Sequence, residues 1–232
     1  MIICLAQIES YKGEIHKNIE KHLVFVQEAI DRKADLICFP ELSITGYEPE
    51  LAKELATTQS DARFDVFQEL ADSGEITICI GVPTSTEGGI CISMIIFRPL
   101  KERQTYSKQF LHSDERPYFT DGTEQIIIEC KGHKIAPAIC YESLLPEHFS
   151  KVKNIGCDIY LASVAKPEKN IQKAYSYFYN LAKENSIPVL MVNSVGYSDN
   201  FMAYGSSAVW NNEGILIQRL DSSLEKNLIY EF

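Results

Sequence analysis

The chain has 232 residues and a formal net charge of −10 at pH 7, with the hydrophobic content of an ordinary globular protein. A chain of this length can bury a substantial core, and no Pro/Gly/Ser-rich linker or internal repeat divides it, so we expect a single domain over residues 1–232. The acidic balance argues against nucleic acid or an anionic membrane as the main partner, and no apolar run reaches membrane-spanning length.

Seven cysteines are scattered along the chain without a CxxC pair, and most of them lie inside apolar runs. This usage is typical of a reducing cytoplasm rather than of a disulfide framework or a zinc site. The apolar start MIICLAQI is only eight residues long and lacks a basic leader, so it is interpreted as a first strand rather than a signal peptide. We therefore expect a cytoplasmic protein.

Apolar patterns in the first half of the chain predict both strands and helices. After His16, apolar residues recur at i, i+4, i+7 and i+11, which predicts an amphipathic helix. The Gly88-Gly89 pair favours a hairpin between two neighbouring strands. The other expected elements are strands at 1–8, 35–39, 76–82, 90–97 and 102–106 and short helices at 49–56 and 63–71.

The second half continues this alternation. Turn sequences at 131–133 and 211–214 predict two further hairpins. Helices are expected at 146–155 and 170–185, and strands at 125–129, 134–139, 158–162, 188–193, 206–210 and 215–220. Strands that alternate with helices, with several hairpins added, predict a layered α/β sandwich with mixed sheets.

One cysteine, Cys140, stands at the end of an expected buried strand. The apolar run before it predicts the strand, and Pro146 opens a helix soon after it. A cysteine at such a corner is held rigidly, with its sulfur exposed and backbone N–H groups nearby to receive an oxyanion. On its own, this pattern is more typical of a buried small apolar residue.

Two further polar residues stand at the ends of elements that are otherwise built for burial. Glu41 follows the strand at 35–39, and Lys108 begins a long loop at 107–122 that also contains Glu115. Long loops in compact domains tend to carry function. Taken singly, Glu41 and Lys108 resemble ordinary exposed charged side chains. Glu115, taken singly, resembles a member of a surface ion pair.

Taken together, these segments resemble the carbon–nitrogen hydrolase (nitrilase) superfamily. The matching stretches are FPELSITGY around Glu41, YSKQFLHSDERPYFTDG around Lys108 and APAICYESLLPE around Cys140, with further support from IPVLMVNSVG and GSSAVWNNEG. The resemblance covers essentially the whole chain. It implies an αββα four-layer sandwich with two mixed β-sheets flanked by helices, and a Glu–Lys–Cys catalytic set.

The resemblance also implies a role for each residue. Glu41 is the expected general base, Lys108 the oxyanion-stabilising cation and Cys140 the nucleophile. Glu115, in the pattern K-x6-E-x3-F-x2-G, is the expected second glutamate that positions Lys108 and the substrate. The expected substrate-binding residues are Tyr141, Tyr47, Phe119 and Ser163. The role of Glu142 is left open.

Amide hydrolysis asks for these residue types independently of the resemblance. A free thiol with a pKa of about 8.5 is mostly protonated at neutral pH, so Glu41 must take its proton and return it to the leaving nitrogen. The tetrahedral oxyanion needs donors such as Lys108 and the backbone N–H of Tyr141, each contributing about 3 to 4 kcal/mol. Water activated by Glu41 then hydrolyses the thioester at Cys140.

The expected function is therefore hydrolysis of a small-molecule amide to a carboxylic acid and ammonia. Alternatives are a nitrilase or N-carbamoyl-amine hydrolase that uses the same site, an acyl transferase, and a catalytically silent binding domain. A Cys140–His148 dyad is a rival arrangement of the nucleophile. Residues 163–166 replace the proline and aromatic that line the acyl pocket in many relatives, so no substrate can be transferred from a subfamily.

No metal or cofactor is expected, because the sequence contains no HExxH, no HxH and no paired cysteines. The expected partners are a small-molecule amide substrate and a second copy of the chain in a homodimer. The helical faces after Cys140 and before Ile187 are the expected interface.

Overall fold

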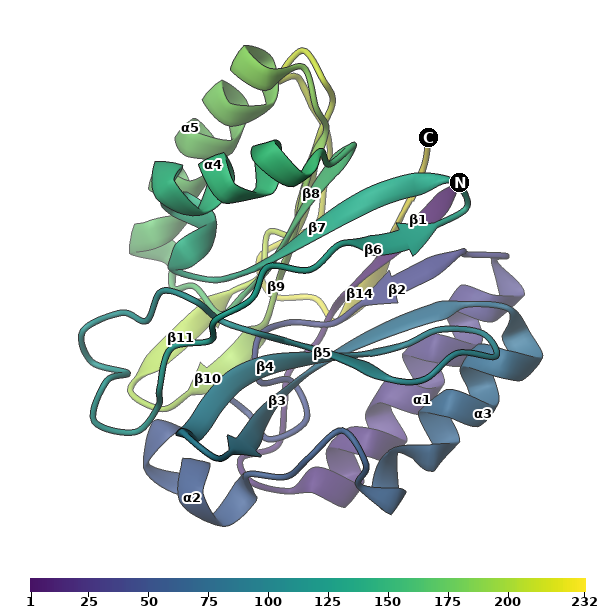
Figure 1. Cartoon of the computed structure of the whole chain (residues 1–232). Helices are drawn as coiled ribbons and strands as arrows, with labels where there is room; N and C mark the ends of the chain where they lie inside the picture. Colours follow the sequence, from purple (N-terminus) through teal and green to yellow (C-terminus); the bar gives the residue numbers. More distant parts are fainter.

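Two six-stranded mixed sheets pack face to face in the structure, a computed structural model that describes residues 1–232 (Figure 1). Across the first sheet the strands are β14 (Lys226–Glu231), β1 (Ile2–Gln7), β2 (Leu36–Cys38), β3 (Thr77–Thr86), β4 (Gly89–Phe97) and β5 (Gln104–Ser107). Across the second they are β13 (Leu216–Arg219), β12 (Ala208–Trp210), β9 (Val189–Asn193), β8 (Ile159–Val164), β7 (His133–Ile139) and β6 (Ile128–Cys130).

Helices cover the outer faces of both sheets. Apolar side chains of α1 (Ile15–Asp31) and α3 (Asp65–Gly74) pack on the first sheet, and those of α4 (Pro146–Ile155) and α5 (Glu168–Asn185) pack on the second (Figure 1). A third apolar cluster of 23 buried residues fills the space between the two sheets. The αββα sandwich expected from the sequence is confirmed. No helix is both long and apolar enough to cross a bilayer.

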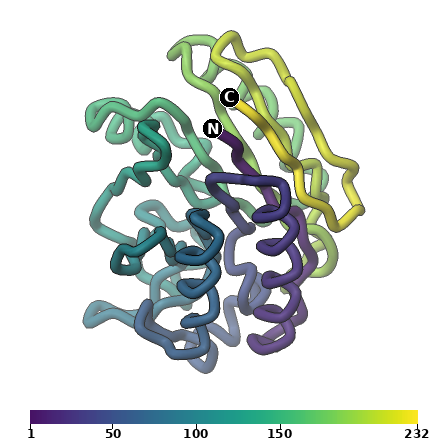
Figure 2. Tube along the Cα trace, turned by 90° about the vertical axis from the view of Figure 1, so that its right-hand side faces the viewer, coloured from purple at the N-terminus to yellow at the C-terminus, as the bar shows by residue number.

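The remaining elements are short. They are α2 (Ala52–Leu55), the hairpin of β10 (Val195–Ser198) and β11 (Phe201–Tyr204), and 3-10 turns at Pro49–Leu51, Ala62–Phe64 and Glu142–Leu144. The predicted hairpins at Gly88-Gly89, 131–133 and 211–214 are confirmed. The sequence analysis missed β10, β11 and β14, because each is short and mixes polar with apolar residues. Strand β14 pairs antiparallel with β1, which brings the two termini close together (Figure 2).

Strand directions bring the chemically interesting loops to one end of the sandwich. In the first sheet β3 is parallel to β2, and two antiparallel pairings in succession make β5 parallel to β2 as well. The carboxyl ends of β2 and β5 therefore share an edge, where Glu41 and Lys108 follow them. In the second sheet β7 and β8 are parallel, so Cys140 leaves β7 beside the end of β8.

Candidate active site

Lys108 lies at the centre of a buried ionic network. Its Nζ donates to Oε1 of Glu41 at 2.8 Å and to Oε1 of Glu115 at 2.6 Å, and the three side chains are at most 2% exposed. Glu115 also accepts hydrogen bonds from the Tyr47 hydroxyl at 3.0 Å and from the backbone N–H of His112 at 2.7 Å. Removing charges from water costs several kcal/mol per ion, and the network offsets this cost with hydrogen bonds in a defined geometry. The ammonium is therefore held in one place.

Two glycines allow the backbones of Glu41 and Lys108 to pack where they do. A Cβ on Gly81 would lie 2.3 Å from the carbonyl oxygen of Pro40, directly before Glu41. A Cβ on Gly122 would lie 2.3 Å from the carbonyl oxygen of Ser107, and the Gly122 N–H donates to the Lys108 carbonyl at 2.7 Å. Both positions tolerate no side chain without displacing a member of the network.

Cys140 occupies a strained backbone position at the end of β7. Its φ of 47° lies in the left-handed region, which costs a residue other than glycine roughly 1 to 2 kcal/mol. Its N–H donates to the Ser163 carbonyl at 2.9 Å, and its own carbonyl accepts from the Ser143 hydroxyl at 2.6 Å. These bonds fix the corner and leave the cysteine partly exposed.

The ionisation of the three groups favours a thiol beside a carboxylate base. Burial, with the negative charge of Glu41, raises the pKa of the Cys140 thiol to about 11. Burial also raises the pKa of Glu41, although Lys108 opposes this effect. Burial works against the charge of Lys108, but the two glutamates raise its pKa above the ordinary lysine value. Oε2 of Glu41 has no hydrogen-bond partner, which leaves it free to accept a proton.

A cavity of about 330 Å³ is lined in part by Cys140. Its wall includes Tyr47, Glu115, Tyr141, Lys166, Asn170 and Phe201. Tyr141 is 37% exposed, and its ring packs edge-on against the ring of His112 with centroids 5.1 Å apart. The arrangement is a small, mostly polar pocket lined by a cysteine, carboxylates and lysines.

Comparison with known proteins identifies the family of this chain. The family model of the carbon–nitrogen hydrolases matches residues 2–231. The chain belongs to this family. It is 28% identical over 99% of its length to a glutamine-dependent NAD(+) synthetase of Acinetobacter baylyi, and 26% identical over 98% of its length to a probable nitrilase of Schizosaccharomyces pombe. It covers 87% of the nitrilase but only 44% of the synthetase, so it spans less than half of the synthetase that it matches.

Solved structures of the family share the fold. An amidase from Nesterenkonia sp. AN1, with acrylamide added at its active-site cysteine, superposes with a TM-score of 0.91 at 20% identity. The match covers 100% of this chain and 93% of the amidase. A carbon–nitrogen hydrolase from Xanthomonas campestris, with an arsenic adduct in its active site, superposes with a TM-score of 0.90 at 23% identity, over 99% and 89% of the two chains.

In this carbon–nitrogen hydrolase, the side chains of Glu41, Lys108 and Glu115 meet in one ionic network, and the negative charge of Glu41 acts on the thiol of Cys140. Tyr47 and Tyr141 line the pocket beside them. Two other expected substrate-binding residues do not line it. Phe119 is 4% exposed and packs in the cluster between the sheets, and the Ser163 hydroxyl donates to the Phe39 carbonyl at 2.8 Å.

The rival dyad with His148 is not formed. Its Nδ1 lies 2.9 Å from the Tyr160 hydroxyl and its Nε2 lies 2.9 Å from the Tyr106 hydroxyl, so both ring nitrogens are occupied away from Cys140. Burial lowers the pKa of His148 to about 4, which keeps the ring neutral at pH 7. No group of three or more His, Cys, Asp or Glu side chains is arranged to hold a metal ion.

Glu142, whose role the sequence left open, joins the two halves of the site. Its Oε1 accepts from the backbone N–H of Ile139, the residue before Cys140, at 2.8 Å. Its Oε2 accepts from the N–H of Gln109, the residue after Lys108, at 2.6 Å. Burial raises the pKa of Glu142 to about 7. One carboxylate thus ties the loop that carries the lysine to the corner that carries the cysteine. Sequence spacing gives no sign of this link.

Lys166 is the other site residue that the motifs did not identify. Its side chain lines the pocket, and its Nζ lies 3.7 Å from Sγ of Cys140.

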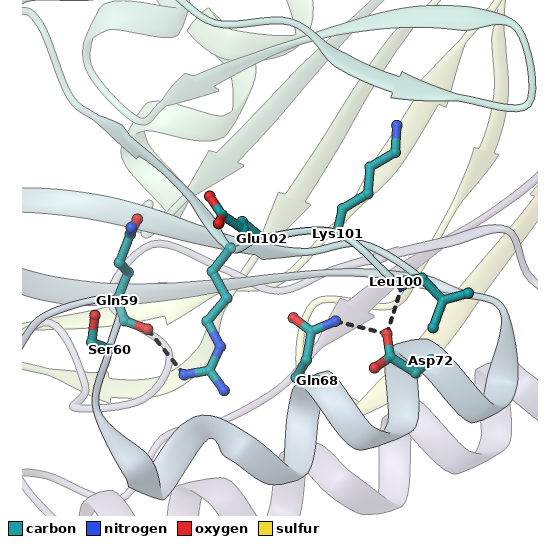
Figure 3. A pocket seen from close by; sticks show the side chains of 8 residues that line it. Gln59, Ser60, Gln68, Asp72, Leu100, Lys101 and Glu102 are labelled. Carbon is teal, nitrogen blue, oxygen red and sulfur yellow. Dashed lines mark hydrogen bonds between the residues drawn. The ribbon is translucent and has the colours of Figure 1, made fainter.

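A separate and larger hollow, of about 410 Å³, lies far from this pocket, beside α3 (Figure 3). Gln68 and the backbone N–H of Leu100 both donate to Asp72 there, and no cysteine lines the hollow. It is a polar surface groove rather than a second active site.

Proposed function

We propose that this carbon–nitrogen hydrolase converts a small-molecule amide to a carboxylic acid and ammonia through a thioester on Cys140. The observation that carries the proposal is the buried ionic network, because it places a fixed ammonium and a free carboxylate oxygen beside a partly exposed thiol. The acrylamide adduct of the Nesterenkonia amidase supports a cysteine nucleophile in a protein of the same fold.

In the first half-reaction, Sγ of Cys140 attacks the amide carbonyl carbon while Glu41 accepts the thiol proton. The raised pKa of Glu41 brings it closer to that of the thiol, which favours the transfer. Negative charge develops on the carbonyl oxygen, where Lys108 and the backbone N–H of Tyr141 stabilise it. Glu41 then passes the proton to the amide nitrogen, the C–N bond breaks, and ammonia leaves a thioester on the sulfur.

In the second half-reaction, water attacks the thioester carbonyl and gives a proton to Glu41. The same oxyanion donors stabilise the second tetrahedral intermediate. The C–S bond breaks, the proton returns from Glu41 to the sulfur, and the carboxylic acid is released. Glu115 holds Lys108 in place through both steps, because Tyr47 and the backbone of His112 fix its carboxylate.

A second candidate is hydrolysis of the side-chain amide of glutamine at the same site. The observation that favours it is the similarity to glutamine-dependent NAD(+) synthetases from several bacteria, at 23% to 28% identity. A nitrile or an N-carbamoyl amine as substrate, or an amine that takes the acyl group in place of water, would use the same residues.

The test is ammonia release from a panel of small amides, glutamine, ureas and nitriles, with Cys140→Ala and Cys140→Ser as controls. We expect release from at least one amide by the wild type and less than about 1% of that rate in either variant. Both variants should keep the wild-type circular dichroism spectrum, because the change removes only the sulfur. Activity well above this level in both folded variants would rule out Cys140 as the nucleophile.

A further inference from the structure

Lys166 is a buried cation without a counter-ion. The residue is 4% exposed, and it forms no salt bridge; the only hydrogen-bond partner of its Nζ is Sγ of Cys140, at 3.7 Å. Its backbone is fixed on both sides, since its N–H donates to Oδ1 of Asn193 at 2.8 Å and its carbonyl accepts from the Tyr204 N–H at 2.9 Å. The backbone of Lys166 is therefore fixed at the cavity wall, and its ammonium has hydrogen-bonding capacity to spare.

A buried charge that lacks a partner is costly, because the protein interior does not replace the water that it loses. Lys108 avoids this cost by pairing with two glutamates. Lys166 lies on the wall of a cavity instead, so a ligand can supply the missing negative charge. A thiol is a weak acceptor and does not replace a carboxylate.

The rim of the pocket carries the same sign of charge. Lys169 and Lys173, from the first two turns of α5, also line the cavity. Of the two carboxylates on the wall, Glu115 is already paired with Lys108, and Asp114 is hydrogen-bonded to the ring of His112. In a chain with a net charge of −10, this local excess of lysine attracts an anion to the pocket.

We propose that the pocket takes amides whose acyl chain carries a carboxylate, and that Lys166 binds this carboxylate while Cys140 attacks the amide. The inference rests on the proposed function of Cys140. A reacting carbon lies about 3 to 3.5 Å from the attacking sulfur, and an ammonium–carboxylate bond is about 2.7 to 2.9 Å long. Because Nζ of Lys166 is 3.7 Å from Sγ, the amide carbon and the carboxylate oxygen of the substrate lie at most about 10 Å apart. The ligand is therefore the monoamide of a dicarboxylic acid, and the cavity of about 330 Å³ favours a short one.

Three matched pairs of substrates test this inference. Malonamate, succinamate and glutaramate have the same carbon counts as propionamide, butyramide and valeramide, and each differs from its partner by a carboxylate in place of a methyl group. We expect the wild type to have a higher kcat/KM for at least one acid than for its neutral partner. Lys166→Met should lower kcat/KM for that acid about 100-fold and change that of the neutral amide less than about 5-fold.

Two control variants sharpen the measurement. Lys166→Arg keeps the charge and should retain part of the preference for the acid. Lys101→Met removes an exposed lysine that lies in the separate hollow beside α3, and should leave both substrates unaffected (Figure 3). An equal loss on both substrates in Lys166→Met would show that the ammonium serves the sulfur rather than a carboxylate, and would overturn the inference. A Lys166→Met variant that keeps the wild-type kcat/KM on both substrates would overturn it as well.

A binding measurement separates this inference from the proposed function. Calorimetry with Cys140→Ala should detect binding of the preferred acid, and Lys166→Met in the same background should abolish it. If no amide is hydrolysed but this binding depends on Lys166, the inference stands and the proposed function fails. If amides are hydrolysed without a preference for the acids, the proposed function stands and the inference fails. If none of the three acids binds or is hydrolysed, the inference is overturned.

Discussion

Two buried lysines approach the same end of the sandwich, and their surroundings differ sharply. Lys108 donates to two glutamates from separate loops, whereas Lys166 has no carboxylate partner and lies 3.7 Å from Sγ of Cys140. The protein engages two of the three N–H donors of the first ammonium, so its position is fixed before substrate arrives and one donor remains for the oxyanion. The second is free to meet a ligand. The comparison separates a cation built into the catalytic machinery from one suited to selecting the substrate.

The largest effect is expected from the carboxylate that pairs with Lys108 and faces the thiol. Glu41→Gln keeps the shape of the side chain but removes the base used in both half-reactions. We expect kcat to fall at least about 1000-fold, as severely as on loss of the nucleophile. Ammonia release by the purified variant measures this loss. Near-normal turnover would mean that Glu41 is a structural partner of Lys108 and no more.

The next largest effect is expected from breaking the ionic network at its centre. Lys108→Met leaves Glu41 and Glu115 buried together without a counter-ion, so we expect the free energy of unfolding to fall by about 3 to 5 kcal/mol. Turnover should fall about 100- to 1000-fold, because an oxyanion donor is lost. Denaturant titration and ammonia release measure the two losses.

Lys166→Met is the matched control for this change. It removes a charge that has no carboxylate partner, so its free energy of unfolding should stay within about 1 kcal/mol of the wild type or rise. If both lysine variants lost stability equally, the contrast between the paired and the unpaired cation would be false.

A smaller effect is expected in the labelling of two cysteines. Cys140 and Cys157 are both partly exposed, and burial raises the pKa of each thiol to about 11. Only Cys140 has a carboxylate base, Glu41, and the ammonium of Lys108 nearby, so iodoacetamide should modify it about 10-fold faster. Peptide mapping after short exposures measures both rates. Faster labelling of Cys157 would argue against an activated sulfur in the pocket.

The smallest effect is a displacement of the pH profile. Because burial raises the pKa of Glu41, the base becomes protonated at a higher pH than an ordinary glutamate, whose pKa is 4.5. As the pH falls, kcat/KM should therefore decline with an apparent pKa above 4.5. The Cys140 thiol, with a pKa of about 11, gives no loss near neutral pH. An acid limb at or below 4.5 would contradict this ionisation state of the network.

Much of the fold and the centre of the site could be predicted from the sequence. Apolar runs that end at Glu41 and Cys140 mark the carboxyl ends of buried strands, and the motifs around them made the family resemblance specific. The αββα arrangement followed from that resemblance together with the alternation of strands and helices. Strands β10, β11 and β14 lacked a clear pattern because they are short and partly polar.

The rest of the site depends on contacts between distant segments. Glu142 binds the backbone of a residue 33 positions away, and Lys166 reaches a sulfur 26 positions away. Gly81 makes room for a backbone from another loop. None of these relations leaves a periodic signal, and a lysine or a glycine in isolation is most often unremarkable. Phe119 and Ser163 were expected in the pocket because they lie near motif residues in the sequence, but their side chains point into the packed layers.

The most direct test of the central claim is to look for the acyl group on the sulfur. The wild type should be mixed with the best amide of the panel, quenched in acid within the first turnovers, and analysed by intact-mass spectrometry and peptide mapping. We expect a mass increase equal to the acyl group, located on Cys140, removed by hydroxylamine and absent from Cys140→Ala. Ammonia release that continues in Cys140→Ala, with no adduct on Cys140 in the wild type, would contradict the thioester mechanism.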